Sequence, residues 1–441
     1  MPIHGRCTIP TQLIDVRTPA DKAVLVGAPE RDLDPRLAEE HLEELARLTD
    51  TAGGTVVGTL RQRLAHPNPR FYIGEGKADE LKELVGARGA TLVIFDEELS
   101  PAQGKNLEDL LGVRVLDRSE LILDIFATRA RSREARVQVE LAQLEYLLPR
   151  LRRMWSHLSR IRGGIGLRGP GETQLETDRR LIGVRISDLK EKLREIARAR
   201  EQQRKSRQGQ FRAALVGYTN AGKSSLLRAL SGADLFVEDR LFATLDSATR
   251  SVEVGSGFSA LMTDTVGFIR KLPHHLVASF RSTLEEAREA DVLLHVIDAS
   301  HPDWEEQLQV VGEVLEELGL RDAERILVFN KVDRITHAEE EALRERTRAL
   351  DPWPAVFVSA HQADSLEALK ETLKARMRAR MAHVVVRFPA GDGEVLAVLH
   401  REGEVLQQAE EDGALSVTVR LPRAVVGRLA GRPGVKIREV A

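Results

Sequence analysis

The sequence predicts an α/β protein whose central domain is built on a mixed, mostly parallel sheet. Three observations support this fold class. Short apolar runs alternate with polar helical stretches over most of the 441 residues, as in chains of βα units. Between residues 129 and 208 the apolar residues instead recur with a seven-residue period. After residue 211 an apolar run leads into a glycine-rich loop and a helix, an arrangement typical of phosphate-binding folds.

The composition is that of a globular protein, with 42% hydrophobic and 30% charged residues. No apolar run approaches the roughly 20 residues needed to cross a bilayer, and the first residues lack the apolar core of a signal peptide. The single cysteine, Cys7, cannot form a disulfide framework. We therefore expect a cytoplasmic protein without a membrane span. The net charge of −3 excludes a chain that is basic throughout.

Residues 1–128 are expected to form an N-terminal α/β domain. The predicted strands are 23–28, 56–60, 91–96 and 113–117, and the predicted helices are 37–48 and 78–85. Strands that alternate with helices favour a parallel sheet.

Residues 129–208 are expected to form a long antiparallel helical hairpin with a glycine-rich tip. Apolar residues at alternating spacings of four and three form a seam on each arm. The seam residues are Val137, Leu141, Leu144, Leu148, Leu151, Trp155 and Leu158, then Ile182, Ile186, Leu189, Leu193 and Ile196. The segment 163–172 between the arms holds five glycines and a proline, which end helices. Pro149 is expected to kink or interrupt the first arm.

The first arm is also strongly basic, with nine arginines against three glutamates between residues 129 and 162. Clustered arginines on an extended arm favour contact with nucleic-acid phosphates, although a solvated helix face gives the same pattern. If the hairpin were only an internal strut, charge reversal at Arg152, Arg153 and Arg160 would leave every binding assay unchanged.

Residues 209–381 are expected to form a nucleotide-binding domain. The strand at 212–216 is followed by GYTNAGKS, in which Gly217, Gly222, Lys223 and Ser224 match the P-loop pattern. The glycines let backbone N–H groups approach phosphate. Lys223 can reach the β- and γ-phosphates, and the Ser224 hydroxyl can ligate Mg²⁺.

A second motif, DTVG, places Asp264 at the end of an apolar strand and Gly267 three residues later. Asp264 can hold the Mg²⁺ shell through water, and the N–H of Gly267 can contact the γ-phosphate. Phe268 stands where Ras-like enzymes carry a water-orienting glutamine. We therefore expect slow intrinsic hydrolysis that a partner accelerates.

Two further motifs follow at strand ends. In NKVD, the Asp333 carboxylate can accept hydrogen bonds from the N1 and N2 donors of guanine, a pair that adenine lacks. The stem of Lys331 can pack on the base, and Asn330 can tie this loop to the P-loop. In VSA, the N–H of Ala360 can meet guanine O6 while Ser359 supports the loop. The four motifs in this order predict a Mg²⁺-dependent GTPase.

The segment 241–250, LFATLDSATR, must supply a threonine that closes over Mg²⁺ and the γ-phosphate. Position alone leaves both Thr244 and Thr249 open.

Residues 382–441 predict the order βαββαβ, a ferredoxin-like α+β arrangement. The strands are 383–388, 404–409, 415–421 and 435–440, and the helices are 393–401 and 422–430. No titratable cluster is found in this domain, so no chemistry is assigned to it.

Taken together, these motifs resemble those of the HflX family of translational GTPases. The resemblance rests on GYTNAGKSSLL, FATLD, DTVGFI, LPHHLVASFRSTLEEA, NKVD, GIGLRGPGETQLETDRR and RFYIGEGKADEL, and it covers residues 10–380. It implies Thr244 of FATLD as the switch threonine. It also implies that the N-terminal domain and the basic hairpin bind the rRNA of the large ribosomal subunit, with the tip toward the peptidyl-transferase region. The resemblance further implies splitting or rescue of stalled or idle ribosomes under stress and, as in some members of the family, use of ATP by the N-terminal domain near Gly74–Lys77. We expect the protein to be a monomer.

The expected site combines the motifs with this resemblance. Lys223, Thr244 and Gly267 are assigned to catalysis, and Ser224 and Thr244 to the metal. The residues assigned to GTP or GDP are Gly217, Tyr218, Thr219, Asn220, Ala221, Gly222, Lys223, Ser224, Ser225, Phe242, Ala243, Thr244, Leu245, Asp246, Asp264, Thr265, Val266, Gly267, Asn330, Lys331, Val332, Asp333, Val358, Ser359 and Ala360.

An alternative from another class of protein is a signalling or scaffold GTPase whose hairpin binds a protein partner. Heptad seams often join proteins. Salt separates the two hypotheses, because phosphate contacts weaken steeply with salt and apolar contacts do not.

Overall fold

The computed structural model describes residues 21–161, 174–205, 210–233, 238, 240–255, 258–272, 286–350, 353–411 and 413–440. Within α5 and α6 it describes the backbone of a few residues without their side chains, among them 151–161. The expected glycine-rich tip, Cys7 and the side chains of Leu151, Trp155 and Leu158 therefore lie outside the description. The chain divides into two compact units, Met1–Leu121 and Ile122–Ala441.

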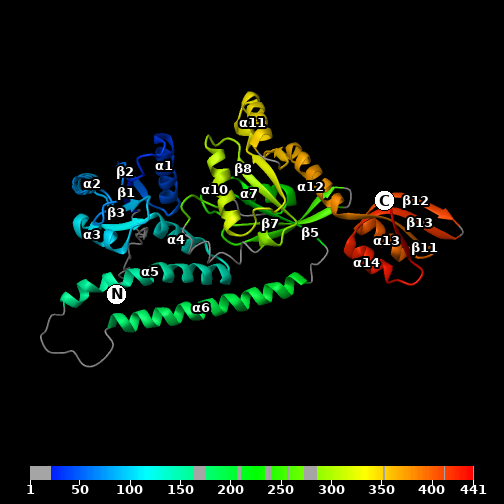
Figure 1. Cartoon of the computed structure of the whole chain (residues 1–441), viewed down its shortest axis with the longest axis horizontal. Helices are drawn as coiled ribbons and strands as arrows, with labels where there is room; N and C mark the ends of the chain where they lie inside the picture. Colours follow the sequence, from blue (N-terminus) through cyan, green and yellow to red (C-terminus); the bar gives the residue numbers. More distant parts are fainter. Residues whose placement is uncertain are drawn as a thin grey trace, which may run out of the picture. The chain divides into compact units, whose positions relative to one another are not determined.

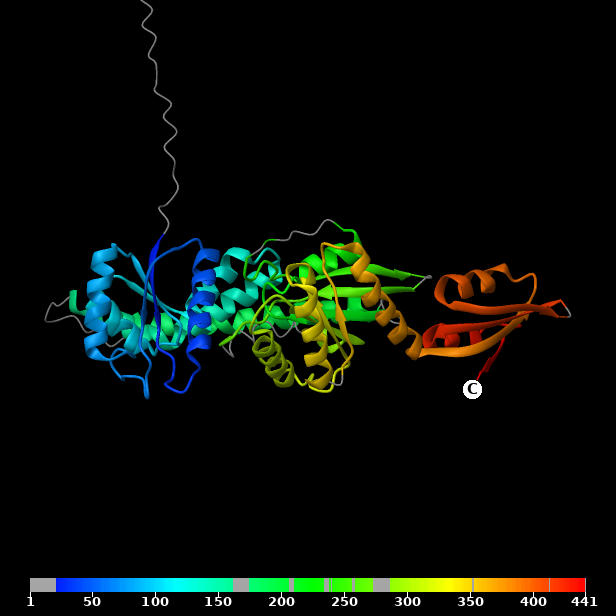
Figure 2. The same cartoon turned by 90° about the horizontal axis from the view of Figure 1, so that it is seen from above.

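The first unit contains a parallel four-stranded sheet. Its strands are β1 (Lys22–Gly27), β2 (Thr55–Arg61), β3 (Leu92–Phe95) and β4 (Arg114–Asp117), in the order β2-β1-β3-β4. Helix α1 (Pro35–Thr51) covers one side, and α2 (Glu75–Arg88) and α3 (Pro101–Leu111) cover the other (Figure 2). The four expected strands and both expected helices are present. The sequence reading missed α3, whose start is fixed by a capping box between Ser100 and Gln103.

Helix α4 (Arg118–Arg129) leads into the second unit and the hairpin, which consists of α5 (Arg133–Ile161) and α6 (Gln174–Lys205) (Figure 1). The expected seam is present. Leu141, Ile186 and Leu189 are buried between the arms, and Val137, Leu144, Leu148, Ile182 and Leu193 pack against them. The expected interruption at Pro149 is wrong, because α5 continues through that residue as one helix.

A six-stranded sheet forms the centre of the second unit. Its strands are β5 (Phe211–Gly217), β6 (Ala248–Gly255), β7 (Phe258–Asp264), β8 (Val292–Asp298), β9 (Arg325–Asn330) and β10 (Ala355–Phe357). Their order is β10-β9-β8-β5-β7-β6, and β6 pairs antiparallel while the other described pairs are parallel. A mixed, mostly parallel sheet is therefore confirmed.

Helices cover both faces of this sheet, because the strands carry apolar side chains on each of the two faces. On one face, α7 (Lys223–Ser231) and α12 (Glu367–Arg380) pack on residues such as Ile326 and Val328. On the other, α10 (Trp304–Glu317) and α11 (His337–Leu350) pack on Leu327 and Phe329. The short helices η1 (Val332–Arg334) and η2 (Ala363–Leu366) follow β9 and β10.

The last elements of the chain follow the expected order. They are β11 (Met381–Pro389), α13 (Gly393–Glu402), β12 (Glu404–Glu411), β13 (Ala414–Pro422), α14 (Arg423–Ala430) and β14 (Lys436–Glu439). The antiparallel sheet has the order β12-β13-β11-β14. Alternate residues of β11 and β13 are buried, and they form a core with α13 and α14. Among the helices of the described residues, none has both the length and the apolarity that a membrane crossing requires.

Candidate functional site

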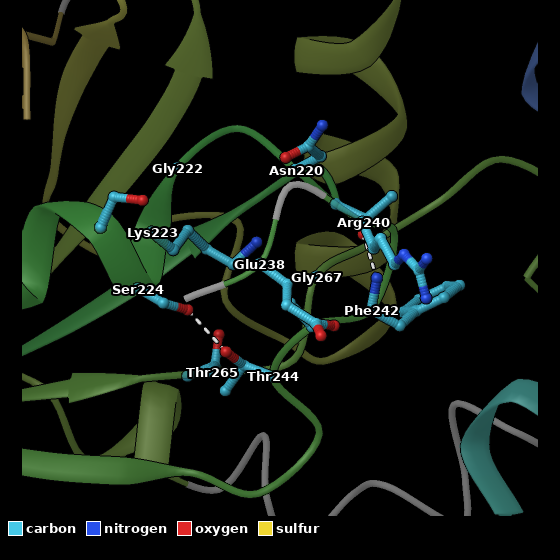
Figure 3. A pocket seen from close by; sticks show the side chains of 13 residues that line it. Asn220, Gly222, Lys223, Ser224, Glu238, Arg240, Phe242, Thr244, Thr265 and Gly267 are labelled. Atoms are coloured by element: carbon cyan, nitrogen blue, oxygen red, sulfur yellow. Dashed lines mark hydrogen bonds between the residues drawn. The ribbon is translucent and has the colours of Figure 1, made fainter. Parts of the chain in front are cut away.

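The loop between β5 and α7 wraps around the mouth of a pocket at the carboxyl edge of the central sheet (Figure 3). Its backbone has positive φ at Gly217 (150°), Asn220 (61°) and Gly222 (94°). A Cβ on Gly217 would lie 2.2 Å from the carbonyl oxygen of Val296, and one on Gly222 would lie 2.2 Å from Nδ2 of Asn330. Glycine is therefore required at both positions, because the backbone has a positive φ and because no room is left for a Cβ.

Lys223 begins α7 with its side chain buried inside the loop. Its Nζ donates hydrogen bonds to the carbonyl oxygens of Gly217 (3.1 Å) and Tyr218 (2.9 Å). Burial lowers the pKa of Lys223 to about 8; the Asp264 carboxylate opposes this shift and Lys331 adds to it. An ammonium held this way has little water around it, so its attraction to a phosphate is strong.

Three oxygen-bearing side chains from separate elements meet beside Lys223. The Ser224 hydroxyl donates a hydrogen bond to Asp264 Oδ2 (2.5 Å) and lies 2.6 Å from Thr244 Oγ1 (Figure 3). Thr249, the other threonine that the sequence left open, lies in β6 with Oγ1 2.9 Å from that of Thr263. Of the two threonines, Thr244 is therefore the one at Ser224.

The chemistry of this cluster fits a magnesium ion. Its donors are two hydroxyls and a carboxylate, and Mg²⁺ prefers oxygen ligands. Asp264 is 2% exposed, and its Oδ1 has no hydrogen-bond partner among the described residues. Burial raises the pKa of the Asp264 carboxyl, while Lys223 and the hydroxyls of Ser224 and Thr244 act in the opposite direction. A cation would supply the partner that this oxygen lacks.

The DTVG segment lies against the P-loop. A Cβ on Gly267 would come within 2.7 Å of Thr219 Cα and 3.0 Å of Lys223 Nζ, so only glycine fits there. Phe268 is 2% exposed. Its N–H donates to the Gly217 carbonyl (3.1 Å), and its own carbonyl accepts from Thr219 N–H (2.7 Å). The Phe268 side chain, at the position of the usual glutamine, is therefore packed in the protein interior. The intervening Thr265 and Val266 are buried, and the Thr265 hydroxyl donates to the Leu215 carbonyl (2.7 Å).

Asn330 joins three loops, including the link to the P-loop that its position predicted. Its Nδ2 donates to the Ala221 carbonyl (3.0 Å), and its Oδ1 accepts from Ala360 N–H (3.1 Å). Lys331 has a φ of 66°, and its Nζ pairs with Asp298 (2.6 Å), a residue that the sequence reading missed. Asp333 lies on η1 with its side chain exposed.

The remaining expected residues of this region support the loops. Val332 N–H donates to the Val358 carbonyl (3.3 Å), and the Ser359 hydroxyl accepts from His361 N–H (3.1 Å). Ser359 N–H in turn donates to Ser365 Oγ (2.8 Å).

The pocket lining contains two charged residues that sequence reasoning missed, Glu238 and Arg240 (Figure 3). They precede the FATLD segment and carry no motif, so only their proximity in the fold identifies them. Asn220, Ser225, Phe242 and Ala243 also line this pocket. Leu245 is 3% exposed, and the Asp246 carboxylate accepts hydrogen bonds from residues 131 and 132.

The segment Gly74–Lys77 lies in the first unit at the start of α2. Gly74 precedes that helix, and its N–H donates to Gln62 Oε1 (2.9 Å). Lys77 Nζ lies 2.8 Å from Glu80 Oε2, so its ammonium is already held by a carboxylate.

Three protein families match the chain in succession. They are described as GTP-binding GTPase N-terminal (residues 39–127), GTP-binding GTPase Middle Region (residues 129–207) and 50S ribosome-binding GTPase (residues 212–331).

Relatives of known name are similar over most of their length. The GTPase HflX of Caldanaerobacter subterraneus is 46% identical over 393 residues, which cover 89% of this chain and 90% of the relative. The protein of the same name from Flavobacterium psychrophilum is 45% identical, with 84% and 92% covered. That from Escherichia coli is 43% identical, with 87% and 90% covered. Among solved structures, a GTP-binding protein from Sulfolobus solfataricus in complex with GDP is 26% identical, with 81% and 98% covered and a TM-score of 0.42.

Proposed function

The chain belongs to the HflX family and is a GTPase, and from this premise we propose that it acts on the large ribosomal subunit. It would split or rescue stalled or idle ribosomes under stress, as a monomer in the cytoplasm. The family description of the central domain as a 50S ribosome-binding GTPase supports this proposal.

The charge of the hairpin is the observation on this chain that carries the proposal. Between residues 129 and 205 there are twenty Lys and Arg against ten Asp and Glu. The three glutamates of the basic stretch of α5 each pair with a cation of α6. The pairs are Glu134 with Arg200, Glu140 with Arg185 and Glu145 with Lys190. These glutamates thus neutralise positive charges of α6. The arginines that α5 carries in excess suit contact with the phosphates of RNA.

We propose that GTP and Mg²⁺ occupy the pocket described above. Residues 217–225 would cradle the phosphates, and residues 330–333 and 358–360 would hold guanine, with Asp333 choosing it over adenine. Ser224 and Thr244 would ligate Mg²⁺, with Asp264 behind them. Mg²⁺ bound there would neutralise charge on the β- and γ-phosphates.

The residues of the chain would then perform three tasks. Lys223 exchanges its carbonyl partners for phosphate oxygens and stabilises their charge. The N–H of Gly267 meets the γ-phosphate, where the absence of a Cβ lets the backbones approach. The Phe268 side chain has no polar group that could orient the attacking water, so the isolated protein should turn over GTP slowly, far below about 1 s⁻¹, until a partner orders the site.

The chain can also be divided into domains. We propose four domains, with boundaries near 128, 208 and 381. The last one is a ferredoxin-like module, because its sheet order β12-β13-β11-β14 is the order of that arrangement.

The proposal is tested by GTP hydrolysis with and without large ribosomal subunits over a salt series. We expect strong stimulation that fades as salt rises. The variant Arg152→Glu/Arg153→Glu/Arg160→Glu should lose the stimulation and keep the basal rate. A control with the same charge change outside the hairpin is Arg321→Glu/Arg346→Glu/Arg401→Glu, whose arginines are exposed. Absence of stimulation at every salt concentration would remove the ribosome from the proposal and leave the GTPase.

A second candidate is a protein partner for the hairpin. Leu147 is exposed on α5, and Leu181 and Val184 are exposed three residues apart on α6, where they could contact an apolar surface of a partner. Stimulation by a protein that persists at high salt and is lost in Leu181→Ser/Val184→Ser would favour this candidate.

A further inference from the structure

Three contacts join the segment around Thr244 to the place where α4 ends and α5 begins. We call residues 126–132 the α4–α5 junction and residues 238–246 the switch segment, of which the structure describes 238 and 240–246. The pairs are Asp246 with Ser132, Phe242 with Phe126, and Glu238 with Arg129. The switch segment therefore has partners on a second element besides the P-loop.

The Asp246 carboxylate binds the two residues that directly precede α5. Its Oδ2 accepts hydrogen bonds from the N–H groups of Arg131 (3.1 Å) and Ser132 (3.1 Å), and its Oδ1 accepts one from the Ser132 hydroxyl. Ser132 directly precedes α5, and its Oγ also accepts from Ala135 N–H (3.0 Å). A carboxylate at a helix N-terminus is stabilised by the N–H groups and the helix dipole.

The Phe242 contact fixes the other side of Thr244. The Phe126 and Phe242 rings meet edge to face with their centroids 4.7 Å apart, and both side chains are fully buried. Phe242 N–H donates to Thr219 Oγ1 in the P-loop (2.8 Å; Figure 3), and its φ is 54°, a value that a side chain this large adopts only when its surroundings hold it.

Thr244 stands two residues from each of these fixed points. Its hydroxyl lies 2.6 Å from that of Ser224, so the backbone between Phe242 and Asp246 sets its place beside Ser224 and Asp264. We propose that Asp246 is a positioning residue for GTP hydrolysis. Hydrogen-bonded to the residues that precede α5, it would hold Thr244 at Ser224 and Asp264, and in this proposal it does not contact the nucleotide to which the sequence motifs assigned it.

This arrangement links the hairpin to the nucleotide. Because Thr244 would engage only a nucleotide with a γ-phosphate, whatever shifts the N-terminus of α5 changes the preference for GTP over GDP. The linkage is reciprocal, so GTP would bias the position of α5 by the same free energy.

The test compares affinities for GDP and for a non-hydrolysable GTP analogue, together with the turnover rate, in the full-length protein with Mg²⁺. In Asp246→Ala we expect affinity for the analogue and kcat to fall at least about tenfold, with GDP affinity unchanged. Asp246→Asn keeps one acceptor oxygen and should recover part of both losses. Equal losses for GDP and the analogue, or no loss for the analogue, would overturn the proposal.

Two further variants separate positioning from direct ligation and from folding. Ser132→Ala removes a partner of Asp246 that is not among the residues lining the nucleotide pocket, and it should reproduce part of the Asp246→Ala loss. The double variant should be no worse than Asp246→Ala alone. If the double variant loses more of the preference for the analogue over GDP than Asp246→Ala alone, the two residues act independently and the proposal fails. Asp392→Ala is the control, since Asp392 caps α13 through Val395 N–H (3.2 Å) and should leave the preference for GTP intact.

Discussion

Asn330 Nδ2 lies 3.0 Å from the carbonyl oxygen of Ala221, and this hydrogen bond fastens the end of β9 to the phosphate-binding loop. The contact is possible because the neighbouring residue, Gly222, has no Cβ in the space that the amide fills. The loops that we propose to bind phosphate and guanine are therefore joined by a direct hydrogen bond, and a substitution in one loop should affect the other.

Gly222→Ala tests this link between the loops. The new Cβ would meet Asn330 at 2.2 Å, and the φ of 94° costs a side chain about 1–2 kcal/mol by itself. We expect nucleotide affinity to fall at least about a hundredfold and stability to fall by about 2 kcal/mol or more. Gly232→Ala is the control, because its φ is 65° but nothing lies near its Cβ. It should lose about 1 kcal/mol in urea unfolding and bind nucleotide normally.

Asp333→Asn tests base selection. An amide can accept from guanine N1 but places an N–H₂ against the guanine amino group, so two hydrogen bonds with a charged partner are lost or weakened. We expect GTP affinity to fall at least about tenfold while affinity for xanthosine triphosphate rises. Competition binding would measure both. Asp322→Asn, another exposed acid, should change neither affinity. Retained preference for GTP in Asp333→Asn would place guanine recognition elsewhere.

His295 should make the protein sensitive to acid. It lies in β8 with a 1% exposed side chain, and burial, with Arg325 and Lys223 as nearby cations, lowers its pKa to about 3. The unfolded chain binds the proton near pH 6.5 and the folded chain does not, so stability falls as pH drops from about 6.5 toward 3. The contribution lost at pH 5 is about 2 kcal/mol. Urea unfolding of His295→Leu should show a smaller loss than wild type between pH 7 and pH 5, and parallel curves would refute this role.

Arg118 should stabilise the first unit. Its guanidinium is 2% exposed and forms ion pairs with Asp96 (2.7 Å) and Glu44, which are equally buried. Arg118→Met leaves two carboxylates buried without that cation, and we expect a loss of about 3–5 kcal/mol in urea unfolding. Combining it with Glu44→Gln and Asp96→Asn should restore part of the loss. Arg114→Met, which breaks an exposed pair with Glu120, should cost no more than about 1 kcal/mol.

At Pro149 the expected interruption of the first arm does not occur. Proline removes one backbone hydrogen bond and usually bends a helix, yet α5 runs from Arg133 to Ile161 without interruption. The seam around Leu141, Leu144 and Leu148 packs on α6 next to this position, and such packing offsets the loss of one hydrogen bond.

The sequence by itself determined the nucleotide-binding loops, the heptad seam of the hairpin and the order of the strands and helices of the last domain. These features depend on residues close together in the chain: a glycine where φ is positive, an apolar residue at each helical or strand period. The motifs taken residue by residue left Thr244 and Thr249 open, and the tertiary structure places Thr244 at Ser224, as the family resemblance implies. Only the tertiary structure decided that Asp246 binds Ser132, just before α5, from more than a hundred residues away, and that Glu238 and Arg240 line the pocket. Such pairings depend on which surfaces come together when the chain packs, and no local period in the sequence records them.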